Sequence, residues 1–169
     1  MNVLLGSGRI YNLLAEKINT NYPKELIQIS PKYAGTTFDG CLSTWHQFKD
    51  EVDEARFLLN NLPEVKEKIF THIYFCIPDV EARHPDKIQW SFDFVDLLKE
   101  HVLSYVYLLN SLVSYPTKLY LFNELDSEDF EVQLLQQCLR PLVMTAIAGT
   151  KSQLIYHTAK TFNINDFGN

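Results

Sequence analysis

The sequence predicts an α/β fold in which a mainly parallel, doubly wound sheet carries helices on both faces. Short runs of apolar and β-branched residues, at 3–5, 71–77 and 118–123, indicate buried strands. The stretches between them repeat apolar residues every three or four positions, which is typical of amphipathic helices. Strands alternating with helices favour a parallel sheet, and right-handed crossovers then give a Rossmann-like order.

The chain opens with a strand, a glycine turn and a helix in direct succession. Residues 3–5 form the predicted strand, the turn is Gly6, Ser7 and Gly8, and apolar residues recur at helical spacing over 10–18. In nucleotide-binding βαβ units such glycines let the backbone approach a pyrophosphate, and the helix N-terminus offers it free N–H groups. The opening stretch therefore suggests a phosphate site.

This turn departs from the full dinucleotide-binding fingerprint. A third glycine is expected where the chain has Tyr11 or Asn12. The alternative interpretation is a plain strand-to-helix turn that needs glycine only for its dihedral angles. If NAD(P) binds, the residues expected to contact it in this turn are Gly6, Ser7, Gly8, Arg9 and Ile10.

The second predicted strand covers residues 25–29 and is bounded by prolines. In dinucleotide-binding folds an acidic residue at the end of this strand selects NAD. Here Ser30 and Lys32 stand there instead, and these side chains would suit the 2′-phosphate of NADP. A simple polar strand end is the favoured alternative.

The remaining elements follow from the same patterns. A proline inside the penultimate element, Pro141, is expected to kink or break its helix. A single domain over 1–162 is expected, followed by a frayed polar tail over 163–169. The other predicted elements are a short strand at 36–38, helices at 45–61, 92–112 and 129–148, and strands at 71–77, 118–123 and 153–157.

Composition excludes several classes of function. A net charge of −6 over 169 residues argues against nucleic-acid binding, which needs a basic face. The longest apolar stretch, 102–113, is too short and too polar to cross a bilayer, and no signal peptide is evident, so no membrane association and a cytoplasmic location are expected. Neither the three cysteines nor the five histidines have metal-ligand spacing, so no metal site is expected.

With these elements in order, the chain resembles a shortened and degenerate member of the short-chain dehydrogenase/reductase family. Residues 6–10 correspond to the family's glycine-rich turn, and 75–78 take the place of its Asn-Ala-Gly segment. Glu100-His101 falls near the Asn of its long helix, and Asn123 ends the strand that delivers its catalytic Ser. Segment 134–138 stands where the family has Tyr-x-x-x-Lys, and it contains neither residue.

A literal Tyr-x-x-x-Lys does occur later, at Tyr156 and Lys160. The family's chemistry needs the two side chains one helical turn apart, with the Lys lowering the pKa of the Tyr. Tyr156 lies in a predicted strand, where residues four apart are separated by roughly 13 Å, so coincidence is favoured. His101 is the best candidate for a functional histidine, and a core or interface position is its favoured alternative.

Two functions follow from the resemblance. The first is a non-catalytic partner or scaffold subunit, forming a homodimer or a heterodimer with an active relative through helices 92–112 and 129–148, whose apolar excess fits this pairing. The second is an active NAD(P)-dependent reductase of a small or carrier-bound carbonyl substrate. No catalytic set is assigned under the first; the weak candidates under the second are His101, Asn123, Tyr156 and Lys160.

Overall fold

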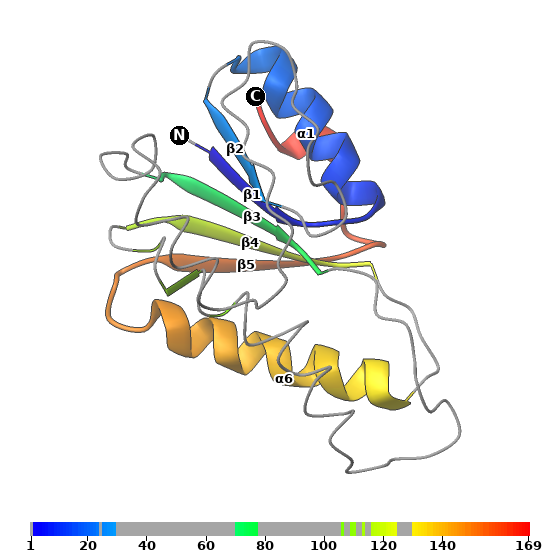
Figure 1. Ribbon diagram of the computed structural model, residues 1–169, viewed down its shortest axis with the longest axis vertical. Coiled ribbons are helices and arrows are strands. Elements are labelled where there is room, and N and C mark those ends of the chain that lie inside the picture. The colour runs from blue at the N-terminus through cyan, green and yellow to red at the C-terminus, as the bar shows by residue number, and fades with distance from the viewer. Residues whose placement is uncertain are drawn as a thin grey trace.

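In the computed structural model, a five-stranded parallel sheet lies between helices (Figure 1). The structure describes residues 2–23, 25–29, 70–77, 106, 109, 110, 113, 116–124 and 130–169. The strand order is β2-β1-β3-β4-β5, and every neighbouring pair is parallel. The strands are β1 (Asn2–Gly6), β2 (Leu26–Ile29), β3 (His72–Cys76), β4 (Lys118–Asn123) and β5 (Gln153–Thr158).

The five strands confirm the predicted α/β class and its parallel sheet. All five residues of β1 are buried, and in β3 only His72 is not fully buried. Such unbroken burial is expected of central parallel strands, which are covered on both faces. This explains why both strands are continuous apolar runs in the sequence rather than alternating ones.

Helices α1 (Arg9–Asn21) and α6 (Phe130–Ile147) lie on opposite sides of the sheet (Figure 1). The spacing of the buried residues matches one helical face in each case. In α1 the buried set is Ile10, Tyr11, Leu14, Ala15 and Ile18. In α6 it includes Leu139, Val143 and Ile147, each one turn from the next.

Of the kink or break expected at Pro141, the break does not occur, because α6 continues through this residue to Ile147. Proline removes one backbone N–H, which leaves the carbonyl of Gln137 without its usual partner. Both Gln137 and Pro141 are exposed, so water can hydrate that carbonyl. The next turn is also braced, because the Thr145 hydroxyl donates to the carbonyl of Pro141 at 2.9 Å.

The expectation that residues 163–169 fray is also wrong. A short 3-10 helix, η2 (Ile164–Asp166), is capped by Asn163, whose side chain accepts from the N–H of Asn165. The Lys17 ammonium of α1 donates to the carbonyl of Ile164 at 2.7 Å. Phe167 is only 4% exposed and belongs to the core cluster under α1. The mostly polar sequence of this tail led to the expectation of fraying, but its one buried aromatic residue, Phe167, attaches it to the core.

Several expected elements lie outside the described residues: the strand at 36–38, the helix at 45–61 and most of the helix at 92–112. Within the last of these, Val106, Leu109 and Asn110 are helical, and Leu109 is buried. Among the residues that the structure does describe, no helix is both long enough and apolar enough to cross a bilayer.

Candidate functional site

The carboxyl ends of the parallel strands meet at one edge of the sheet, where ligands of open α/β sheets usually bind. The Gly6-Ser7-Gly8 turn follows β1 at this edge, and Glu124 follows β4. Close by, Ile77 directly follows β3, and its N–H donates to the carbonyl of Phe122 at 3.0 Å. We therefore treat this edge as the candidate site.

Gly6 has a structural explanation that requires no ligand. Its φ of +103° lies in the region that side chains rarely adopt, and a Cβ built on it would overlap the carbonyl oxygen of Cys76. Gly6 and Cys76 are register partners in the β1–β3 pair. The glycine is thus needed for β1 and β3 to approach each other where β1 ends.

Glu124 occupies the N-terminus of α1. Its Oε1 accepts the N–H of Ile10 at 3.1 Å and lies 3.4 Å from Nε of Arg9. A Cβ on Gly8, whose φ is +114°, would come within 2.8 Å of the other carboxylate oxygen. A helix N-terminus attracts negative charge, and here the chain supplies that charge itself.

Because of this carboxylate, the glycine at position 8 can be explained without a bound phosphate. Gly8 makes room for the side chain of Glu124 at the position where a pyrophosphate would approach the helix. A phosphate brought there would meet a negative charge and would have to displace the bond to Ile10. Ser7 is 1% exposed, and its hydroxyl has no hydrogen-bond partner among the residues that the structure describes. The other expected nucleotide contacts, Ser30 and Lys32, lie outside the described residues.

Tyr156 and Asn123 come together at the same edge, on the side of the sheet that α6 covers. The side-chain amide of Asn123 donates to the Tyr156 hydroxyl at 3.1 Å. Lys160 is exposed in the turn after β5, and no hydrogen bond or ion pair links it to Tyr156 in the described part of the chain. His101, the remaining catalytic candidate, is outside that part.

Arg140 of α6 completes this group. Its guanidinium carbon lies 4.9 Å from the centre of the Tyr156 ring, in cation–π geometry. Beside the pair is a cavity of about 450 Å³ between α6 and the carboxyl halves of the strands. Its described lining includes Ile77, Leu121 and Met144.

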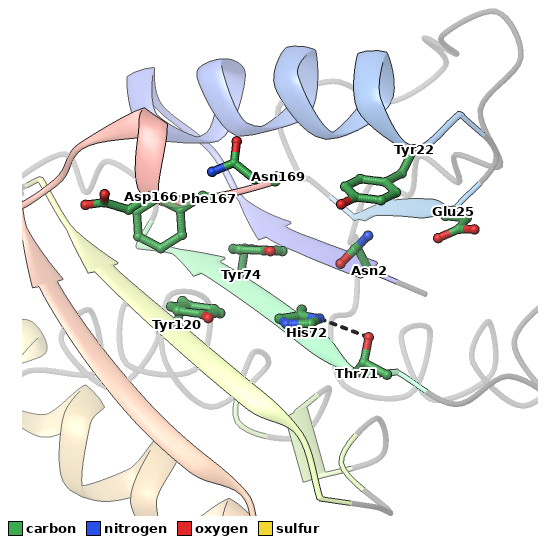
Figure 2. Close-up of a pocket in the computed structure, with 11 residues that line it drawn as sticks. Asn2, Tyr22, Glu25, Thr71, His72, Tyr74, Tyr120, Asp166, Phe167 and Asn169 are labelled. Carbon is green, nitrogen blue, oxygen red and sulfur yellow. Dashed lines mark hydrogen bonds between the residues drawn. The ribbon is translucent and has the colours of Figure 1, made fainter.

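A second cavity, of about 290 Å³, lies at the opposite, amino edge of the sheet (Figure 2). Its floor is a row of stacked rings, in which His72 lies 6.3 Å from Tyr74, and Tyr74 lies 5.1 Å from Tyr120. Tyr22, the residue after α1, and Phe167 of the C-terminal tail face this row. Burial raises the pKa of the Tyr74 hydroxyl well above its ordinary value, so this phenol stays neutral.

His72 makes the stability of the fold depend on pH. Burial, and then the nearby Lys118 ammonium, lower its pKa below 6.5. The unfolded chain therefore binds this proton more readily, and stability falls as the pH drops below about 6.5 towards the folded-state pKa. We expect His72→Gln to lose less stability than the wild type between pH 7.5 and pH 5 in urea unfolding. Equal losses in the two proteins would contradict this coupling.

Sequence reasoning missed Glu124 and Arg140. Glu124 follows the predicted strand 118–123 directly, and an acid at a strand's carboxyl end was a usable signal. Arg140 offered no such signal, because only the packing of α6 on β5 brings it over Tyr156. Within the described residues, no group of three or more His, Cys, Asp or Glu side chains could hold a metal ion.

Comparison of the chain with protein-family models, with curated proteins and with solved structures gives no match.

Proposed function

We propose that this chain is a Rossmann-like, doubly wound α/β protein that acts as a non-catalytic partner subunit. The observation that carries the proposal is the Glu124 carboxylate on the N-terminus of α1. A nucleotide-dependent enzyme of this architecture would keep that N-terminus open for phosphate. In this chain the Glu124 carboxylate occupies the N-terminus of α1 instead.

The strand order supports the doubly wound architecture. From β1 the chain moves to β2 on one side, while β3, β4 and β5 follow on the other. Right-handed crossovers that run in opposite directions along a sheet place their helices on opposite faces. The positions of α1, between β1 and β2, and α6, between β4 and β5, agree with this rule (Figure 1).

The catalytic candidates support a partner function rather than catalysis. Lys160 is exposed, and in the described part of the chain no hydrogen bond or ion pair joins it to Tyr156, so it gives no means of activating the phenol. Such proton-transfer groups contribute typically about 10²–10⁴-fold to a rate. The Tyr156 hydroxyl instead accepts a hydrogen bond from Asn123, and its ring lies beneath the Arg140 guanidinium, a contact that links α6 to β5.

The pairing surface that we propose includes α6 and the helix expected over 92–112. Among the described residues, Met144 of α6 is the large apolar side chain that stays exposed, at 54%. Pro141, one turn earlier, is exposed as well. Exposed apolar groups at helical spacing on one face suit a second copy or a relative of similar fold.

Nucleotide binding tests the proposal directly. We expect no thermal shift with NADH or NADPH, and no hydride turnover on carbonyl substrates. Glu124→Gln keeps an oxygen that can accept from Ile10 but removes the charge. A shift that appears only in this variant would show that the carboxylate closes the turn. A clear shift in the wild-type protein would overturn the proposal.

Sedimentation over a dilution series tests the pairing. We expect a dimer that dissociates on dilution, and a Met144→Glu variant that is monomeric at concentrations where the wild type is dimeric. Because Met144 is exposed, the melting temperature of the Met144→Glu variant should stay close to that of the monomeric wild type. A wild type that is monomeric throughout would contradict self-pairing, and pairing with a relative would then need separate detection.

A second candidate function is the NAD(P)-dependent reductase, which one observation favours. The Tyr156 hydroxyl lies at the carboxyl edge of the sheet, next to a cavity and bonded to an amide. A phenol in that place is suited to donate a proton to a carbonyl oxygen. Loss of turnover in Tyr156→Phe, with nucleotide binding retained, would establish this function.

A further inference from the structure

The cavity beside α6 presents hydrogen-bond donors from two elements. The Tyr156 hydroxyl accepts the amide proton of Asn123, which leaves its own proton to be donated. Arg140, stacked over the same ring, contributes guanidinium donors. Both groups line the cavity, so two donors, one of them charged, are held in place by their contacts with each other.

The described lining of this cavity carries a charge opposite to that of the whole chain. The protein has 21 acidic and 15 basic residues, yet the described lining contains Arg140 and no carboxylate. No ion pair joins Arg140 to an acid in the part of the chain that the structure describes. A guanidinium beside a phenol donor is the chemistry that binds a carboxylate.

The rest of the lining fits an apolar body. Ile77 and Leu121 come from the sheet, and Pro141 and Met144 come from α6. The volume of about 450 Å³ falls within the range of small-molecule sites, and the location is the carboxyl edge of a parallel sheet. We propose that this cavity binds a small organic carboxylate whose aliphatic or aromatic body lies against these apolar side chains. This inference does not rest on the partner function proposed above, and it assigns Pro141 and Met144, which also belong to the proposed pairing surface, to the ligand site.

Octanoate is a suitable probe, with octylamine and octanol as matched compounds of the same length. We expect saturable binding of octanoate in titrations followed by ligand-observed NMR, and much weaker binding of the other two. Arg140→Gln removes a charge-assisted bond and should weaken octanoate binding about tenfold or more. Tyr156→Phe keeps the ring beneath Arg140 and should weaken it less, by a factor of about five.

Lys151→Gln is the control, because Lys151 is an exposed cation after α6 that does not line the cavity. It changes the net charge as Arg140→Gln does, so equal losses in the two variants would indicate non-specific attraction and overturn the proposal. Equal binding of octanoate and octanol, or no binding of octanoate, would overturn it too. Because Arg140 is exposed, unchanged far-UV circular dichroism is expected and verifies that the variant is folded.

Discussion

Replacing Gly6 with Ala should destabilise the protein by about 4 kcal/mol or more, near the upper end for single substitutions. The added Cβ would overlap the backbone carbonyl of Cys76, which cannot move aside as a side chain could. The overlap could be relieved only if β1 and β3 moved apart at the centre of the sheet. The positive φ of +103° adds strain of its own. Urea unfolding, or the soluble yield if the variant does not fold, measures the effect.

Gly149→Ala is the matched control. Gly149 also has a positive φ, of +79°, but a Cβ there would meet no atom within 4 Å. The substitution therefore carries only the conformational penalty, about 1–2 kcal/mol. If Gly6→Ala and Gly149→Ala were equally stable, close approach of β1 and β3 would not explain Gly6, and a ligand-based explanation of the turn would regain support.

Phe167→Ala should cost about 3–5 kcal/mol, as expected for a large aromatic side chain removed from a core. Its ring meets those of Tyr120, Phe122 and His157 edge-on, at centroid distances of 5.2 to 5.3 Å. It also closes the space between α1 and the sheet (Figure 2). The loss would be measured as a lower midpoint of urea unfolding.

Two companion variants separate packing from other effects. Phe167→Leu retains much of the apolar volume and should recover more than half of the loss. Asp166→Ala changes an exposed neighbour in η2 and should stay within about 0.5 kcal/mol of the wild type. A Phe167→Ala protein as stable as Asp166→Ala would mean that the tail does not anchor the core.

The candidate site illustrates where sequence reasoning stops. The turn at residues 6–8 was predicted from its glycines, and both its place and the helix after it agree with the structure. The identity of the group facing the helix could not be predicted, because Glu124 is 114 residues away from Ile10 along the chain. Tyr156 and Asn123 were each candidates, but only the β4–β5 register brings them into contact.

The sequence by itself determined the described strands, the helices α1 and α6 and the parallel class, because hydrophobic periodicity and buried apolar runs are local properties of the chain. Tertiary structure decided what those elements do together. It set the Glu124 carboxylate at the N-terminus of α1, placed Arg140 over Tyr156, and brought Phe167 from a polar tail into the core. Each of these contacts joins residues far apart in sequence, and their energies depend on distance and burial in space, which no local pattern encodes.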